Sequence, residues 1–213
     1  SLRQFADELE GAKDFNAALH DLVVREIKAH KRIIFNGNNY APEWAEEAEK
    51  RGLLNLKNAA EALPHFADKK NIELFERNKV FTEREVVTRT DIMLENYSKV
   101  LNIEALTMID MAKQDIYPAV ESYIASLCGA LKEKKGTLPG VSFPAQERMI
   151  AKLASDAERM LERAEMLDSL LVESKAHETP AKLALFFAEK VIPVMQELRA
   201  YADGMELNTA ASV

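Results

Sequence analysis

The segment Thr82–Tyr117, TEREVVTRTDIMLENYSKVLNIEALTMIDMAKQDIY, decides the fold class of this chain. Thr82 and Glu85 match the T-x-x-E pattern of a capping box, in which two side chains satisfy backbone N–H groups at a helix start. Neither glycine nor proline interrupts the chain from there until Pro118, and apolar residues recur at helical spacing. The segment therefore predicts one long helix, which Pro118 kinks or divides because proline lacks a backbone donor.

The chain downstream carries the signals of further long helices. A loop at residues 134–140 separates the first from the next, which begins at Pro144. Thr179 and Pro180 form a cap and first-turn proline for a last helix, which Pro193 should bend. Long antiparallel helices joined by short loops predict an all-α fold, a long-helix bundle of the up-down type.

The chain upstream of this bundle reads as shorter, irregular helices. We expect them at residues 2–9, 14–34, 42–51, 58–63 and 70–77, with Gly52, Pro64 and Asn78 as interruptions. The sequence thus predicts two parts: an irregular helical segment, residues 1–80, and a C-terminal helical bundle, residues 81–213.

Composition excludes several classes of protein. A net charge of −7 and a pI near 5.3 provide no broad basic surface for a phosphate backbone, so nucleic acid is not an expected partner. The single cysteine, Cys128, permits no internal disulfide and no cysteine-based zinc site. No apolar run is long enough to span a bilayer, which takes about 18 residues. We expect a cytoplasmic protein without a membrane partner.

Motifs that carry chemistry are missing from the sequence. Di-iron helical bundles use Glu-x-x-His, but the residues three before His20, His30, His65 and His177 are Ala17, Ile27, Ala62 and Ser174. Glu26 with His30, and Glu173 with His177, are spaced as exposed pairs on a helix face. There is also no glycine-rich phosphate loop. We assign no catalytic, cofactor-binding or metal-binding residue to any position.

The segment from Asn102 to Asp115 has apolar residues on more than one helix face, which indicates a helix covered on most sides. Glu104, Asp110 and Lys113 are then expected to pair near the core. A functional site would produce the same pattern, so both interpretations stay open.

Three strings resemble the C-terminal region of type III glutamine synthetases. They are HKRIIFNGNNYAPEWAEEAEKRGLLNL (His30–Leu56), EALPHFADKKNIELFERNKVFTERE (Glu61–Glu85) and LENYSKVLNIEALTMIDMAKQDIYPAV (Leu94–Val120). The resemblance covers most of the chain from Leu2 to about Val120, in order, and the last two helices fit the family's helical extension in style only.

The resemblance implies a parent enzyme that ligates ammonia to glutamate with ATP and Mg²⁺ or Mn²⁺. In that family the catalytic and cofactor-binding residues precede the matched region, so no cofactor is expected in this fragment and the isolated chain is expected to be inactive. The expected partners are the remainder of the parent enzyme and its other subunits in a homo-oligomer.

The irregular first part would pack on the parent's catalytic domain. Residues expected to meet that domain are Phe15, Ile27, Phe35, Trp44 and Phe81. A different class of function is a free-standing helical-bundle adaptor or oligomerisation module with no catalytic role. A small metalloenzyme or redox enzyme is disfavoured by the missing Glu-x-x-His pattern.

Overall fold

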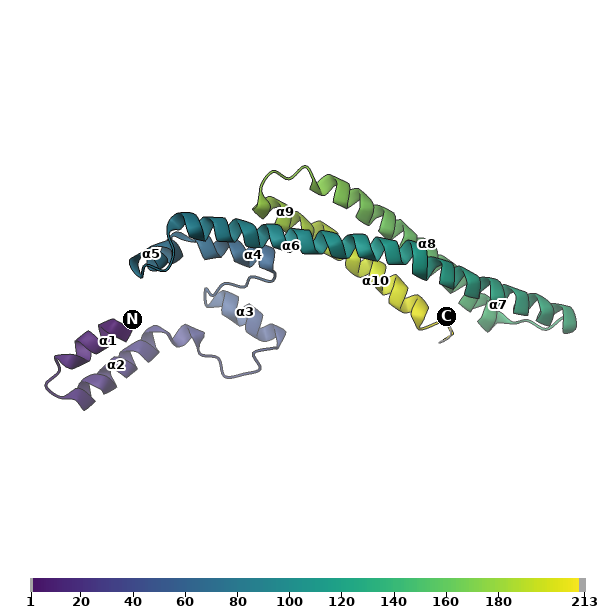
Figure 1. Ribbon diagram of the computed structural model, residues 1–213. Coiled ribbons are helices and arrows are strands. Elements are labelled where there is room, and N and C mark those ends of the chain that lie inside the picture. Colours follow the sequence, from purple (N-terminus) through teal and green to yellow (C-terminus); the bar gives the residue numbers. More distant parts are fainter. Residues whose placement is uncertain (1, 211–213) are drawn as a thin grey trace. The chain divides into compact units, whose positions relative to one another are not determined.

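The structure is a computed structural model and describes residues 2–210. Within this range it contains helices and loops but no strand, so the predicted all-α fold is confirmed (Figure 1). The chain forms two compact units, unit 1 up to Lys57 and unit 2 from Asn58 onward. The sequence placed the division later, after residue 80.

Unit 1 is built from short helices: α1 (Leu2–Glu10), α2 (Phe15–Ala29), the 3₁₀ turn η1 (Lys31–Ile33) and α3 (Pro42–Lys50). The Asp14 carboxylate caps α2 by accepting a hydrogen bond from the backbone N–H of Ala17 at 3.1 Å. The α2 helix ends before His30 rather than at residue 34 as predicted, because the backbone tightens into η1.

The short helices α4 (Ala59–Ala62) and α5 (Lys69–Arg77), with the 3₁₀ helix η2 (Leu63–Ala67) between them, belong to unit 2. All three pack on the long helix α6 (Glu83–Met111). Buried Ala60 of α4, Leu94 of α6 and Ala184 of α9 (Pro180–Phe186) form a small apolar cluster. This packing explains why the units divide before residue 58 and not near residue 80.

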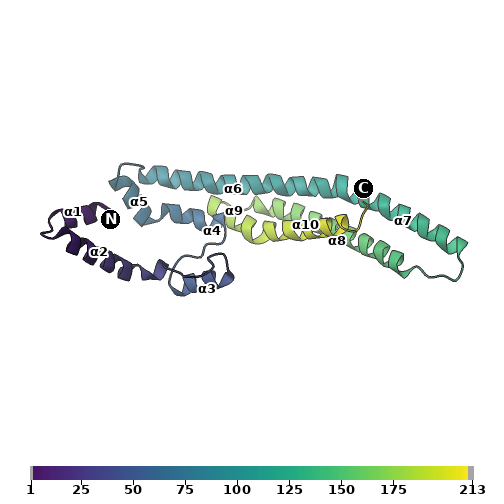
Figure 2. The same cartoon turned by 90° about the horizontal axis from the view of Figure 1, so that it is seen from below.

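The long helix continues past Pro118 as α7 (Tyr117–Thr137), and Figure 2 shows the two parts following one another. Between them lies one π turn, η3 (Ala112–Ile116), in which the N–H of Tyr117 donates to the carbonyl of Ala112. A proline ring clashes with the carbonyl four residues earlier in a regular α-helix, and the wider π turn changes the backbone at that position. Pro118 therefore produces a π turn and does not end the helix.

Pro193 is accommodated in the same way. The π turn η4 (Phe187–Val191) precedes it at the same distance along the chain, and the helix continues as α10 (Ile192–Glu206). Here the N–H of Ile192 donates to the carbonyl of Phe187. Where the sequence predicted a bend at Pro193, the structure has a π turn.

The turn between α7 and α8 (Pro144–Ser174) starts later than the sequence suggested, since α7 runs through Gly136 to Thr137. Lys135 Nζ lies 2.6 Å from Glu147 Oε1, which links the two helices across the turn. The contact lies next to the end of α7, which the sequence placed before Gly136 because glycine often ends a helix.

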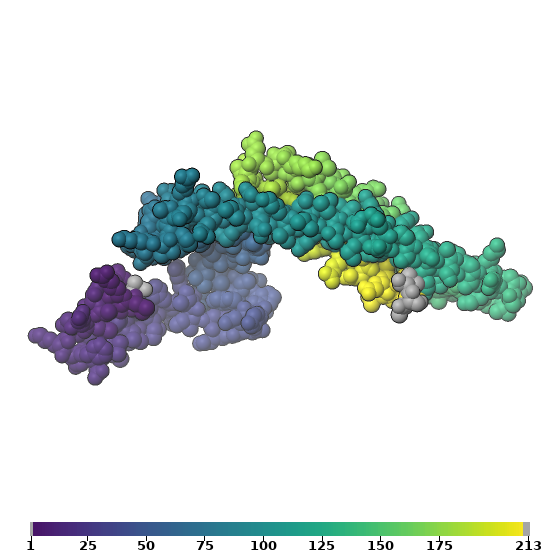
Figure 3. All heavy atoms as spheres, viewed as in Figure 1, coloured from purple at the N-terminus to yellow at the C-terminus, as the bar shows by residue number. Residues whose placement is uncertain are grey.

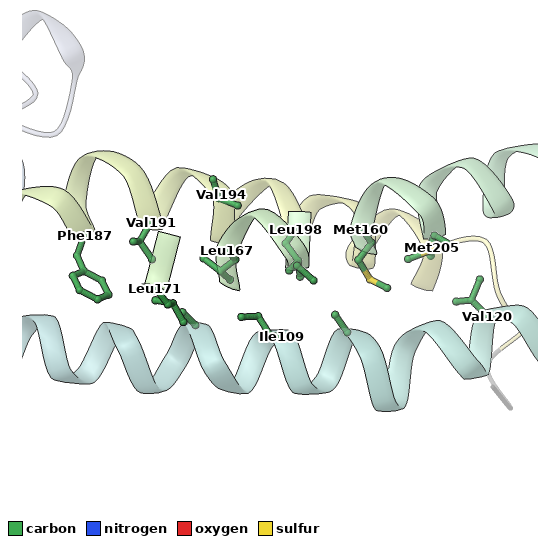
Figure 4. Packing of buried hydrophobic residues seen from close by; sticks show 14 of the residues in the cluster. Ile109, Val120, Met160, Leu167, Leu171, Phe187, Val191, Val194, Leu198 and Met205 are labelled. Carbon is green, nitrogen blue, oxygen red and sulfur yellow. The ribbon is translucent and has the colours of Figure 1, made fainter. Parts of the chain in front are cut away.

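The core of unit 2 lies where α6, α7, α8 and α10 meet. Ile109, Leu167 and Leu198 point toward one another from α6, α8 and α10 (Figure 4). The fully buried apolar residues of this core include Leu153, Met160, Leu167, Val191 and Met205. Burying side chains of this size contributes about 1.5–3 kcal/mol each, so unit 2 has a substantial core of its own.

Candidate functional site

Unit 1 has few buried residues. Among its described residues only Leu22 and Ala48 are buried. Along α2, by contrast, an exposed apolar row repeats every fourth residue, which places it on one side of the helix: Phe15, Leu19, Val23 and Ile27. We name these four residues the α2 row. It is the pattern of a helix face that packs against another surface.

An ion pair between exposed side chains links α1 and α2. Arg25 donates to both carboxylate oxygens of Glu8, at 2.7 and 2.8 Å. These hydrogen bonds lower the pKa of Glu8 and raise that of Arg25. An exposed pair of this kind fixes geometry but adds little stability.

Arg51 connects α3 with the loop that precedes it, and the sequence analysis did not identify this role. Its Nη1 donates to the carbonyl of Ile34 at 2.7 Å and its Nε to Glu47 Oε1 at 2.6 Å. Its guanidinium carbon also lies 5.9 Å from the ring centroids of both Phe35 and Trp44. The two rings are tilted by 31° to each other, with centroids 4.5 Å apart. Glu47 and Arg51 have the i, i+4 spacing of a helix-face pair. The contacts with Ile34 and Phe35 follow no local pattern, because these residues lie in the loop after η1, whereas Arg51 follows α3 directly.

The five residues expected to meet a further domain divide into two groups. Phe15 is 55% exposed and Ile27 is 53% exposed. Phe35, Trp44 and Phe81 are half-buried within this chain, Phe81 by contacts with Phe75 and with the Arg89 guanidinium. The expectation that these residues meet a further domain stays a prediction, with Phe15 and Ile27 as its strongest members.

The α6 helix is covered on one side only, contrary to the prediction that it is covered on most sides. Leu94, Ala105 and Ile109 are buried. Exposed apolar residues form a second row: Ile92, Val100, Ile103, Leu106 and Met111. We name these five residues the α6 row. In Figure 3 the spheres of α6 are visible along the surface of unit 2.

The predicted pairing of Glu104, Asp110 and Lys113 near the core is wrong. All three are exposed. Asp110 instead accepts a hydrogen bond from Gln114 one turn later on the same side of the helix. The apolar residues on the second face of α6 misled the prediction, since they face away from the core of this chain.

The histidines do not gather with other metal-ligating residues. Among residues 2–210 no group of three or more His, Cys, Asp or Glu side chains could hold a metal ion. Half-buried Glu26 and exposed His30 form a pair at the predicted i, i+4 spacing, with Oε2 and Nε2 3.5 Å apart. Glu173 and His177 do not share a helix face, because α8 ends at Ser174 before His177 is reached.

Two further observations concern membrane spans and the single cysteine. None of its described helices is both long and apolar enough to cross a membrane. Cys128, the single cysteine, is exposed on α7 and unpaired.

A family profile described as "Glutamine synthetase C-terminal domain" matches residues 18–135, more than half of the chain. The chain belongs to this family. The match includes most of unit 1, the short helices of unit 2, all of α6 and nearly all of α7. The resemblance that the three strings carried is therefore confirmed.

Individual relatives agree with the family assignment. A glutamine synthetase of Butyrivibrio fibrisolvens is 36% identical over 189 residues, which cover 87% of this chain and 27% of that protein. A type-3 glutamine synthetase of Dictyostelium discoideum is 29% identical over 196 residues, 90% of this chain and 26% of that protein. A glutamine synthetase of Bacteroides fragilis is 25% identical over 89% of this chain.

Two facts about the glutamine synthetase relatives bear on function. The chain spans about a quarter of their length, and the matched quarter is their C-terminal part. An alignment of 189 residues also extends well past Val120, where the three strings end. The similarity therefore includes sequence beyond the family profile's own match at residues 18–135.

Proposed function

We propose that this chain is the C-terminal structural and assembly part of a type III glutamine synthetase, an enzyme that ligates ammonia to glutamate with ATP. The observation that carries the proposal is the family match, since it covers most of unit 1 and about half of unit 2. In this proposal the chain supplies packing surfaces, and the reaction takes place on the rest of the enzyme.

The α2 row supports this role. Because Leu22 and Ala48 are the only buried residues in the described part of unit 1, this unit has little apolar core to stabilise it, while four apolar side chains of α2 face solvent. Covering such a row removes apolar surface from water at about 25 cal/mol per Å². The proposed occupant is the remainder of the parent enzyme or another of its subunits, in a homo-oligomer.

The proposal places ATP and Mg²⁺ or Mn²⁺ on the other part of the parent. Such metals take oxygen ligands from several carboxylates that converge on one point. The described residues contain no cluster of three potential ligands, and carboxylates such as Glu47 and Glu95 are paired with Arg51 and Lys99 four residues later in the chain. The residues present therefore do not fit these metals.

Assembly in trans tests the structural role. The Butyrivibrio fibrisolvens enzyme, shortened by its matched C-terminal quarter, is co-expressed with this chain carrying an affinity tag. We expect the two to elute together in size-exclusion chromatography. Ile27→Glu should reduce this association at least tenfold, whereas Lys28→Glu, on the opposite side of α2, should leave it nearly unchanged.

Two outcomes would overturn the structural role: no association of the wild-type chain, or equal association of the Ile27→Glu and Lys28→Glu variants. The first would favour a free-standing module with partners of a different kind.

An activity assay tests where the chemistry takes place. The pure chain is incubated with glutamate, ammonia, ATP and Mg²⁺ or Mn²⁺, and glutamine is measured by chromatography. We expect none above a protein-free control. Turnover that a substitution within this chain abolishes would place the active site here and contradict the proposal.

A further inference from the structure

Unit 2 contains a cavity of about 600 Å³, open to solvent, between α6, the end of α8 and the start of α9. Its apolar wall is formed by Ile103, Leu183 and Phe187. Pockets that hold small organic molecules measure roughly 300–1,000 Å³ and combine apolar walls with a few polar groups. The cavity has the size and the wall for such a ligand.

Three polar side chains at this cavity have unused hydrogen-bonding capacity. Asn102 is half-buried, and its amide makes no hydrogen bond to any described residue. Lys175, directly after α8, forms no ion pair within residues 2–210. The ring of His177 is held against Phe186, with centroids 4.6 Å apart, while its nitrogens bond to no described side chain.

The other polar groups at the cavity are already satisfied. The hydroxyl of Ser98 donates to the carbonyl of Leu94 at 3.1 Å, and that of Ser174 donates to the carbonyl of Leu171 at 2.8 Å. Glu95 and Lys99 pair with each other, Nζ to Oε2, at 3.1 Å. Lys175 is therefore the one cavity cation without a carboxylate partner among the described residues.

We propose that this cavity binds a small organic acid that carries one carboxylate and an apolar body. The body lies against Ile103, Leu183 and Phe187. The carboxylate accepts hydrogen bonds from the ammonium of Lys175 and the amide of Asn102, and charge-assisted hydrogen bonds of this kind are stronger than neutral ones. The inference does not depend on the proposed role in glutamine synthetase.

Three probes separate the parts of this ligand. They are 3-phenylpropanoate, which has both charge and body, 3-phenylpropanamide, which has the body without charge, and acetate, which has the charge with almost no body. Binding to the full chain is measured by calorimetry and by NMR shift changes at Asn102 and His177. The acid should bind at least about tenfold more tightly than either other probe, as expected when charge and apolar contact both contribute.

Matched variants locate the site. Lys175→Gln should weaken binding of 3-phenylpropanoate about fivefold, as expected for a lost charge-assisted hydrogen bond near solvent. Lys190→Gln removes an exposed lysine on η4 that does not line the cavity and should leave binding unchanged. Circular dichroism checks that both variants fold as the wild type does.

The proposal is overturned if the acid does not bind, if the amide binds as tightly as the acid, or if the two lysine variants weaken binding equally. Binding of the acid that Lys175→Gln selectively weakens supports it.

Discussion

Thr82 and Glu85 satisfy each other's backbone donors at the start of α6. The N–H of Thr82 donates to Glu85 Oε2 at 2.8 Å, and the N–H of Glu85 donates to Thr82 Oγ1 at 3.4 Å. The Thr82 hydroxyl also donates to the same carboxylate at 2.9 Å. This capping box fixes the first residue of the longest helical stretch in the described chain.

Removal of the capping hydroxyl should destabilise unit 2. Thr82→Ala is expected to lower the free energy of unfolding by about 1 kcal/mol, the usual cost of losing such a cap. Urea denaturation followed by circular dichroism at 222 nm measures it. Thr88→Ala, at an exposed position inside α6, is the control and should have almost no effect. Equal losses in the two variants would contradict the role of the cap.

The same carboxylate should make stability depend on pH. The backbone N–H of Thr82, and then its hydroxyl, lower the pKa of Glu85 below its ordinary 4.5. A lowered folded-state pKa adds stability above pH 4.5, and this stability is lost as the pH falls through the lowered value.

Thermal unfolding between pH 7 and pH 3 tests this dependence. Glu85→Gln should lose less stability than the wild type on acidification, whereas Glu83→Gln, in the same helical turn, should follow the wild type. If the melting temperature of Glu85→Gln fell with pH as much as that of the wild type, Glu85 would not be the source of the pH dependence.

The core of unit 2 and the α6 row should respond differently to truncation. Leu167→Ala, at a fully buried position, should cost about 2–5 kcal/mol through lost burial and the cavity left behind. Leu106→Ala, at a position 49% exposed in the α6 row, should cost well under 1 kcal/mol. Chemical denaturation of both variants measures the difference. A large cost at Leu106 would mean that the α6 row is covered in the isolated chain.

Arg51 should control the environment of Trp44, the single tryptophan of this chain. Arg51→Gln removes the cation beside the Phe35 and Trp44 rings and the hydrogen bond to Ile34. We expect the Trp44 emission to move to longer wavelength and the stability of unit 1 to fall by about 1–2 kcal/mol. Lys50→Gln, next to it on α3, is the control and should keep the wild-type spectrum. An unchanged spectrum for Arg51→Gln would contradict the cluster.

The sequence predicted the elements whose signals are local. The capping box gave the start of α6, Pro144 and Thr179–Pro180 gave the starts of α8 and α9, and Pro42 gave that of α3. Two helix ends differ from the prediction. The α7 helix passes Gly136, where Lys135 contacts Glu147 of α8, and α2 stops before His30, where the backbone tightens into η1. The sequence predicted that Pro118 kinks or divides its helix and that Pro193 bends the last one. The structure has a π turn before each proline, which the sequence did not predict.

The candidate surfaces depended on distant residues. The cavity brings together Asn102, Lys175 and His177, which come from α6 and from the chain that follows α8. Arg51 likewise reaches the carbonyl of Ile34 and the Phe35 ring across a loop. No spacing rule joins residues so far apart, because their contact is made by packing rather than by helical periodicity.

The sequence by itself determined that this chain is all-α, where most of its helices begin, and, through three strings, the family to which it belongs. These properties follow from local capping, proline and periodicity, or from direct similarity. Only the tertiary structure decided which apolar residues of α6 are buried: Ile109 faces α8 and α10, whereas Ile103 remains exposed. The physical reason is that periodicity gives each helix its faces, but burial depends on which neighbour covers each face.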